Sequence, residues 1–93
     1  MTVHAIVALH ITEPKSLADY RDKAADALAK HSGAVLQASR ELELIEGDAE
    51  LPDLYAILTF PDRDAALAWI NDPALQDVHA LRRGSGRSTI TLL

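Results

Sequence analysis

Residues 54–73 read LYAILTFPDRDAALAWINDP, and they combine a strand, its end and the start of a helix. Apolar side chains occupy every second position from Leu54 to Phe60, which is the period of a strand with one buried face. Pro61 ends the strand, and Asp62 is a residue type that caps helices. The apolar positions that follow recur at helical spacing: Ala65, Ala66, Trp69 and Ile70. This stretch therefore predicts a strand and a helix whose apolar sides face each other.

Toward the N-terminus the sequence predicts a similar unit. Val3–Ile11 has apolar residues at all its odd positions, which predicts a strand. Thr12 offers a hydroxyl cap and Pro14 a first-turn proline for the next helix. Gly33 predicts a left-handed end to this helix. The segment Ala34–Glu46 is mostly extended in pattern and predicts a long strand, which a loop separates from the stretch above.

Toward the C-terminus, Asp72–Pro73 predicts the cap and first turn of a short helix. Its expected apolar positions are Leu75, Val78 and Leu81. Gly84–Gly86 predicts a flexible joint, and Ser88–Leu93 a last strand. The order β-α-β-β-α-(α)-β indicates an α+β fold over residues 1–93: the ferredoxin-like split βαβ arrangement, with the helices on one face of an antiparallel sheet.

The composition is that of a single globular domain. Of the 93 residues, 48% are hydrophobic and 25% charged, which suits one modest core and excludes disordered and collagen-like classes. The chain has no cysteine, which excludes a disulfide scaffold and favours a reducing, cytoplasmic location. Its net charge of −5 argues against nucleic acid and anionic membranes as partners. The uncharged run at residues 1–12 is too short for a membrane span and lacks the basic start of a signal peptide.

The second face of the predicted sheet mixes apolar and polar side chains. In the two central strands it carries His4, Ile6, Ala8, His10, Tyr55, Ile57 and Thr59. A face exposed to water rarely groups such large apolar residues, and a packed core rarely holds two histidines without partners. We therefore expect a homodimer, in which a second copy covers this face and encloses a half-polar pocket for a small molecule. The alternative is an open face with scattered apolar residues.

Several short motifs follow one register along almost the whole chain. They are Glu46-Gly47, Phe60-Pro61-Asp62, Ala66, Trp69, Asp72-Pro73 and Arg82, together with Tyr20 and Ser32-Gly33. In these motifs the chain resembles the uncharacterised family called domain of unknown function 1330. The resemblance implies a dimeric α/β barrel, in which two ferredoxin-like sheets pack face to face. The wider superfamily includes cofactor-free monooxygenases, isomerases and decarboxylases, and also proteins without known activity, so the resemblance does not select a reaction.

Three positions depart from the family pattern. Leu75 replaces a tyrosine, Thr59 an acidic residue and Ser32 a glycine. If the acid and the tyrosine act in a chemistry of the family, this member has lost it. The positions that the resemblance carries over, without a role, are Tyr20, Glu46, Trp69 and Arg82.

Four side chains are candidates for binding a ligand: His10, Tyr20, Tyr55 and Arg82. His10 and Tyr55 are also the catalytic candidates, because a histidine titrates near neutrality and a tyrosine hydroxyl can donate a proton. Each has a plainer alternative. His10 would be a half-exposed residue at a strand end, Tyr55 would pack across a dimer interface, and Tyr20 would be a core residue.

The remaining candidates concern Arg82 and its neighbours. The arginines of the segment Arg82–Arg87 suit a carboxylate or phosphate ligand through forked contacts, or form an ordinary basic hinge. For Glu46 we expect a structural role, in which an ion pair with Arg82 would fix the last helix against the second strand. We expect Trp69 to pack in the core.

No motif predicts a metal or a cofactor. His4 and His10 lie about 20 Å apart along one strand, too far to share a metal ion. The segment around Gly84–Gly86 lacks the spacing of a nucleotide-binding loop. Three functions stay open: a homodimer that binds a small molecule, a cofactor-free enzyme acting on a small apolar acid, and a purely structural dimer. Without a complete catalytic constellation, the first is favoured.

Overall fold

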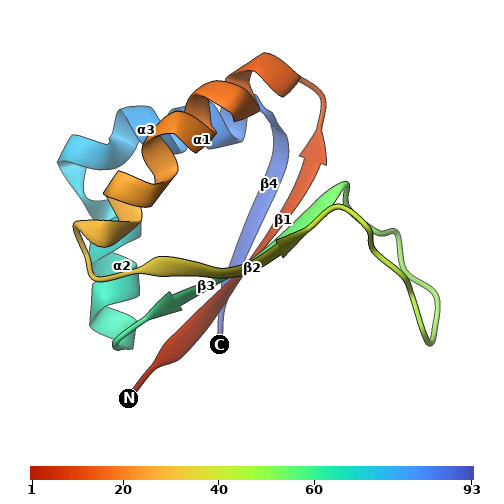
Figure 1. The fold of residues 1–93 in the computed structure, drawn as a ribbon, viewed down its shortest axis with the longest axis horizontal. Coiled ribbons are helices and arrows are strands. Elements are labelled where there is room, and N and C mark those ends of the chain that lie inside the picture. Colours follow the sequence, from red (N-terminus) through yellow and green to blue (C-terminus); the bar gives the residue numbers. More distant parts are fainter.

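The chain forms one antiparallel sheet with all its helices on the same face (Figure 1). The computed structural model describes residues 1–93 throughout. The elements are β1 (Val3–Ile11), α1 (Pro14–Ala29), β2 (Ala34–Ser39), β3 (Leu54–Phe60), α2 (Arg63–Asn71), α3 (Gln76–Gly84) and β4 (Gly86–Leu92), with a 3₁₀ turn at Pro73–Leu75. This order confirms the predicted α+β, split βαβ class.

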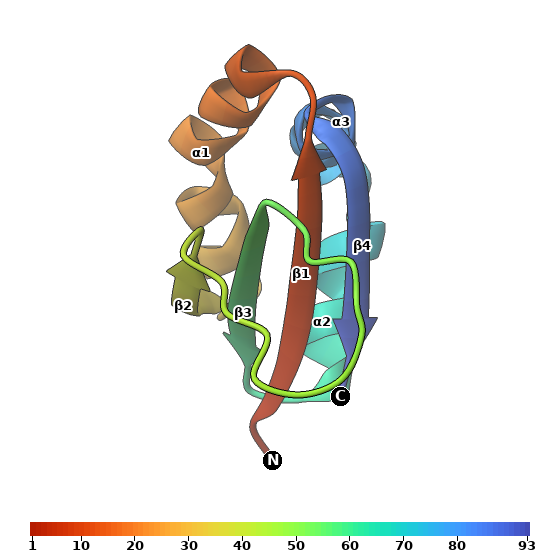
Figure 2. The same cartoon turned by 90° about the vertical axis from the view of Figure 1, so that its right-hand side faces the viewer.

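The sheet has the strand order β2-β3-β1-β4, so β1 and β3 lie in its centre. All neighbouring pairs are antiparallel, with Ile6 opposite Ile57 and Ala8 opposite Tyr55. Since side chains alternate along a strand, these pairs share one face. Figure 2 looks onto this face: no helix covers it, and only the loop between β2 and β3 passes in front. We call it the open face.

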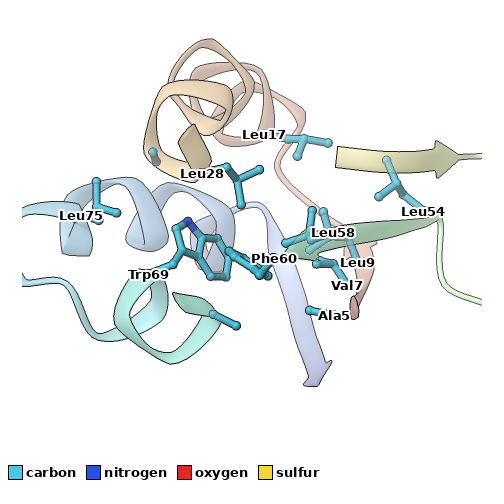
Figure 3. Close-up of a cluster of buried hydrophobic side chains, with 12 residues drawn as sticks. Ala5, Val7, Leu9, Leu17, Leu28, Leu54, Leu58, Phe60, Trp69 and Leu75 are labelled. Atoms are coloured by element: carbon cyan, nitrogen blue, oxygen red, sulfur yellow. The ribbon is translucent and has the colours of Figure 1, made fainter. Parts of the chain in front are cut away.

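The opposite face of the sheet, which we call the covered face, carries the core. The odd positions of β1 and the even positions of β3 point into it, as their alternation predicts. The core cluster, shown in Figure 3, consists of Ala5, Val7, Leu9, Leu17, Ala27, Leu28, Leu54, Leu58, Phe60, Ala66, Trp69 and Leu75. The Trp69 ring lies 5.6 Å from that of Phe60 and meets it at a tilt. α1 and α2 thus bury their apolar sides against the two central strands.

The second strand is shorter than predicted. β2 ends at Ser39, and residues 40–53 leave the sheet on the side away from the helices (Figures 1 and 2). The prediction of an extended Ala34–Glu46 is therefore wrong beyond Ser39, because β3 begins only at Leu54 and offers nothing for residues 40–46 to pair with. The register shift in β2 lies between Val35 and Gln37, within the strand itself.

The end of α1 differs from the prediction by one residue. Ser32, not Gly33, has the left-handed conformation, with φ of 59°. The N–H of Gly33 donates to the carbonyl of Leu28 at 2.8 Å and that of Ser32 to the carbonyl of Ala29 at 3.1 Å, which is the Schellman pattern. Gly33 is needed for a different reason: a Cβ there would lie 2.6 Å from Cε1 of Phe60. The glycine makes room for the core.

The joint between α3 and β4 is packed and not the flexible hinge that was predicted. Ser85 is fully buried, and its hydroxyl donates to the carbonyl of Arg82 at 2.6 Å. Its carbonyl accepts the N–H groups of Thr12 at 2.7 Å and Glu13 at 2.9 Å. These bonds satisfy donors at the start of α1, where no side chain caps the helix, so the predicted Thr12 hydroxyl cap is also wrong. Gly86 has φ of 148°, and a Cβ there would collide with the carbonyl oxygen of His10.

The other two helix starts follow the prediction. The Asp62 carboxylate accepts the N–H of Ala65 at 2.8 Å, and the Asp72 carboxylate accepts the N–H of Ala74 at 2.8 Å. α3, however, is turned about its axis relative to the expectation: its fully buried side chains are His79 and Arg82. The predicted apolar positions beyond Leu75 are only half-buried. This orientation places Arg82 beside Tyr20 of α1.

Candidate functional site

A cavity of about 130 Å³ lies between α1 and the covered face of the sheet. It is lined by Val7, Leu9, Leu17, Tyr20, Arg21, Ala24, Leu28, Val35, Ala38, Leu54, Ala56 and Leu58. Eleven of these twelve residues are hydrophobic, and Arg21 is the exception. Since Arg21 and Val35 are exposed, the cavity reaches the surface where α1 passes over β2. The inner wall is the core itself.

Alanines leave this space unfilled. Ala24 on α1, Ala38 on β2 and Ala56 on β3 all face the cavity, where most core positions carry larger side chains. Enclosed voids of similar size and lining in other proteins hold water poorly and take up molecules of about the size of benzene. The lining offers no carboxylate or imidazole, so acid–base chemistry would depend on the Tyr20 hydroxyl alone.

A buried arginine lies behind the cavity wall. Arg82 is only 2% exposed, and its Cζ lies 5.5 Å from the ring centroid of Tyr20 and 5.4 Å from that of Trp69. Nη1 donates to Nδ1 of His79 at 2.8 Å, and Nε donates to the Ser88 hydroxyl at 3.3 Å. No carboxylate forms an ion pair with it. The guanidinium is thus held by aromatic faces and neutral acceptors.

His79 is the neutral partner of this arginine. Its Nε2 lies 3.0 Å from the carbonyl of Trp69, which can only accept, so Nε2 carries the proton and Nδ1 accepts from Arg82. Burial lowers the pKa of His79 below its usual value, and the charges of Arg82 and Arg83 lower it further. The ring also meets Trp69 edge-on, with centroids 4.7 Å apart. The imidazole therefore stays neutral and orients both neighbours.

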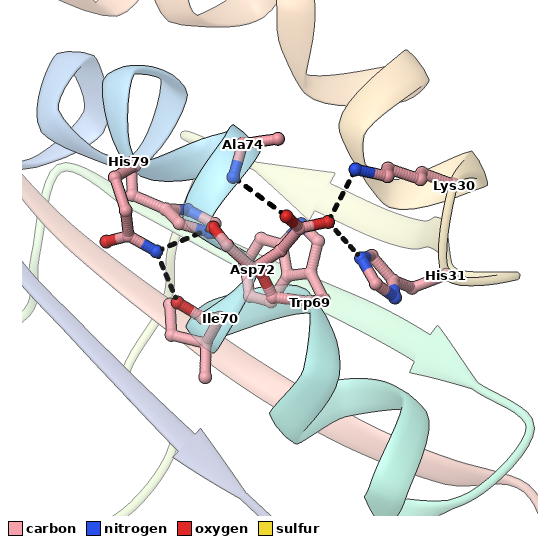
Figure 4. Close-up of polar contacts among 8 residues, drawn as sticks. Lys30, His31, Trp69, Ile70, Asp72, Ala74 and His79 are labelled. Atoms are coloured by element: carbon pink, nitrogen blue, oxygen red, sulfur yellow. Dashed lines mark hydrogen bonds and ion pairs between the residues drawn. The ribbon is translucent and has the colours of Figure 1, made fainter.

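A polar cluster joins the end of α1 to the turn after α2 (Figure 4). The Asp72 carboxylate lies 2.7 Å from Nζ of Lys30 and 2.8 Å from Nε2 of His31, in addition to its bond from the N–H of Ala74. The bonds from Lys30 and His31, in that order of size, hold the pKa of Asp72 far below its usual range. Gln76 adds a bond to the Asp72 carbonyl at 2.9 Å. These contacts tie the end of α1 to the turn that follows α2, so the cluster is structural.

The open face has its own polar group at one end. Nη2 of Arg87 donates to Nε2 of His10 at 2.9 Å, and Oε1 of Glu50 lies 3.6 Å from Nδ1 of His10 and 3.4 Å from Nη2 of Arg87. Glu50 comes from the loop that crosses this face. Tyr55 lies on the same face and is 37% exposed. Both ring nitrogens of His10 thus already have partners.

The sequence places the chain in a known family. A family described as a domain of unknown function, DUF1330, matches residues 2–93. The chain belongs to this family. No protein of curated function matches it. The resemblance stated from the motifs is therefore confirmed over almost the whole chain.

Solved structures share the fold of this DUF1330 protein. A protein of unknown function from Rhodopseudomonas palustris has a TM-score of 0.76 at 20% identity, over 99% of this chain and 80% of the other. A dimeric ferredoxin-like protein of unknown function from Jannaschia sp. CCS1 has a TM-score of 0.73 at 14% identity, over 100% and 98%. A mutant of SnoaB, a cofactor-independent oxygenase from Streptomyces nogalater, has a TM-score of 0.69 at 16% identity, over 99% and 90%. At these identities the similarity is one of fold.

The four predicted ligand-binding residues of the DUF1330 protein lie on two sides of the sheet. Tyr20 and Arg82 lie on the covered side, where Tyr20 lines the cavity and Arg82 lies behind it. His10 and Tyr55 lie on the open face. The structure therefore does not bring the four together within one chain.

The sequence also predicts structural roles for Trp69 and Glu46, and the structure supports only the first. Trp69 lies in the core, 2% exposed. Glu46 lies exposed in the loop, and the expected ion pair with Arg82 is not formed, because that segment leaves the sheet before reaching α3. His79 was missed as part of the site. Its spacing of three residues before Arg82 on a helix was the available signal.

No helix has the length and apolar character that a membrane span requires. No group of three histidine or acidic side chains gathers in a geometry suited to a metal ion.

Proposed function

We propose that this DUF1330 protein binds a small apolar molecule in the cavity between α1 and the sheet, and that it acts as a homodimer. The observation that carries the binding proposal is the lining: eleven hydrophobic residues around about 130 Å³, open to the surface at one end. Binding of an apolar ligand in such a space is favourable, because the ligand displaces water that has few hydrogen-bond partners there. The volume suits a ligand with about one ring.

The open face supports the homodimer. Ile6 and Ile57 lie opposite each other in its centre, and Tyr55 extends the apolar area toward the loop. A patch of this kind in the middle of a sheet is typical of an interaction surface. The dimeric protein from Jannaschia sp. CCS1 has the same fold. A cytoplasmic location agrees with a chain free of cysteine.

An alanine pair on α1 tests the binding site. Ala24 lines the cavity, while Ala25, one residue on, is exposed. Toluene binding to the wild type would be followed by NMR shifts of the lining methyl groups. We expect Ala24→Leu to weaken toluene binding at least tenfold, because the new side chain fills the cavity, and Ala25→Leu to bind like the wild type. Equal binding by both variants, or no binding by the folded wild type, would contradict the proposed site.

A cofactor-free enzyme acting on a small apolar acid is the second candidate function. The fold shared with SnoaB favours it, but the likeness is too distant to carry over an activity. The catalytic candidates His10 and Tyr55 lie across the sheet from the cavity, so they would serve a pocket between two open faces. Any turnover found by product analysis should fall in His10→Ala and Tyr55→Phe, while cavity binding of toluene stays unchanged. Turnover that survives both changes would remove these two residues from the mechanism.

A purely structural dimer is the third candidate. Its prediction is a homodimer with no ligand site, and the alanine-lined cavity argues against it. Native mass spectrometry of gently purified protein distinguishes the cases, because it reports the number of subunits and any retained small molecule together.

A further inference from the structure

Arg82 is a buried cation without a counter-ion. Its side chain is 2% exposed, and its two hydrogen-bond partners, His79 and Ser88, are neutral. Taking a guanidinium out of water is unfavourable unless opposite charge or a full set of acceptors replaces the water. A purely structural role would be met by an uncharged residue, so the unpaired charge points to an anion that is absent from the free protein.

One buried donor beside Arg82 lacks an acceptor, and the guanidinium has a free nitrogen of its own. Arg82 has five N–H groups, and its Nη2 makes no hydrogen bond. Trp69 Nε1 is buried and has no partner either. Figure 3 shows this indole nitrogen on the side of the ring that faces α1. Buried polar groups in proteins are nearly always paired, so the unpaired indole N–H beside a guanidinium whose Nη2 is free indicates a missing acceptor.

Tyr20 separates these donors from the cavity. Its side chain is part of the cavity lining, and its ring centroid lies 5.5 Å from Cζ of Arg82. Tyr20 is half-buried and belongs to the part of α1 that borders the opening at Arg21. A rotation of this one side chain would connect the apolar cavity to the guanidinium. The two features then form one site with an apolar body and a cationic end.

We infer that the natural ligand of the cavity is a small apolar carboxylic acid, whose carboxylate pairs with Arg82 when Tyr20 turns aside. This inference rests on the proposed binding function and specifies its ligand class. The planar guanidinium presents paired N–H groups that match the two oxygens of a carboxylate. His79 is neutral and holds the guanidinium through Nη1, so Nη2 stays available for the anion. A compact phosphate could use the charge but not the apolar cavity.

Matched probe molecules test the inference on the wild-type protein. Benzoate has both a ring and a charged carboxylate. Toluene has the ring alone, benzamide has the ring with a neutral amide, and acetate has the carboxylate alone. We expect benzoate to bind at least tenfold more tightly than benzamide and acetate. It should shift the single indole N–H resonance of Trp69 and the Nε–H resonance of Arg82, while toluene shifts only the cavity methyl groups. Equal binding of benzoate and benzamide, or of benzoate and acetate, would overturn the inference.

Two variants complete the test. Arg82→Met should abolish the preference for benzoate over benzamide while toluene still binds, which also shows that the variant is folded. If Arg82→Met does not fold, Tyr20→Ala replaces it: removal of the barrier should strengthen benzoate binding and leave the benzoate-induced shift at Trp69 intact. A preference that persists in Arg82→Met, or weaker benzoate binding in Tyr20→Ala, contradicts the assignment. Failure of toluene to bind the wild type would instead refute the proposed function, so the two failures are distinguishable.

Discussion

The covered and open faces of the sheet are made by the same strands but have different tasks. On β1, Ala5, Val7 and Leu9 point under the helices and are at most 5% exposed, while the residues between them, Ile6 and Ala8, keep part of their surface. Because side chains alternate, one strand supplies both the core and an outer surface. The difference teaches that stability and association can be altered separately, by changes at adjacent positions.

Adjacent residues on β3 give the strongest test of this separation. Leu58 is 4% exposed in the core, and Ile57 is half-buried on the open face. We expect Leu58→Ala to lower the free energy of unfolding by about 2–5 kcal/mol at every protein concentration, because it leaves a cavity. Ile57→Ala should cost less than about 1.5 kcal/mol in dilute protein and more as the concentration rises. Urea titrations at two concentrations measure both, and the same loss for the two variants would show that the faces are not separate.

A charge on the open face tests its pairing with a second copy. Ile6→Glu should raise the dissociation constant of the homodimer at least tenfold, since each interface would bury two unpaired carboxylates. Leu67→Glu is the matched control, because Leu67 is a large exposed residue on α2, on the other side of the sheet from the open face. Analytical ultracentrifugation measures the change. A dimer unaffected by Ile6→Glu would place the interface elsewhere.

The covered side should also show a pH dependence of its own. The native pKa of His79 is lowered, so its contribution to stability is full above about pH 6.5 and is lost as the pH falls through that value, where the unfolded chain takes up a proton. Between pH 7.5 and 5.5 we expect the free energy of unfolding to fall, and we expect this fall to be absent in His79→Gln. The carboxyl of Asp72, which is paired with Lys30 and His31, also has a lowered pKa, and its contribution to stability is lost only in more acidic solution. Urea titrations of both proteins at both pH values decide the question, and parallel pH profiles would contradict the role of His79.

The smallest predicted effect is that of Ser32, in the turn that leads from α1 into β2. Ser32 has a positive φ, a conformation that a side chain disfavours and glycine adopts freely. Ser32→Gly should raise the free energy of unfolding by about 0.5 kcal/mol, and Gly33→Ala should lower it, because its Cβ would meet Phe60. Thermal unfolding measured in parallel ranks the variants. A destabilised Ser32→Gly would show that the serine contributes contacts that outweigh its strain.

Much of the fold was predictable because its signals are local. The alternation of Val3–Ile11 and Leu54–Phe60, and the capping residues Asp62 and Asp72, act within a few residues of themselves. The candidate site was predicted less well. Tyr20 and Arg82 were among its residues, but their separation from His10 and Tyr55 was not foreseen. The helices that carry Tyr20 and Arg82 pack on one face of the sheet, while His10 and Tyr55 point to the other.

The amino-acid sequence by itself determined the order of elements, the face of each central strand that is buried, and membership in the DUF1330 family. Only the tertiary structure decided where β2 stops, that α3 turns His79 and Arg82 inward, and that three alanines from different elements face one unfilled space. Periodicity and capping are short-range and can be seen in a single segment. A cavity and a buried charge are properties of several segments together, because they depend on what the neighbouring elements leave unfilled or unpaired.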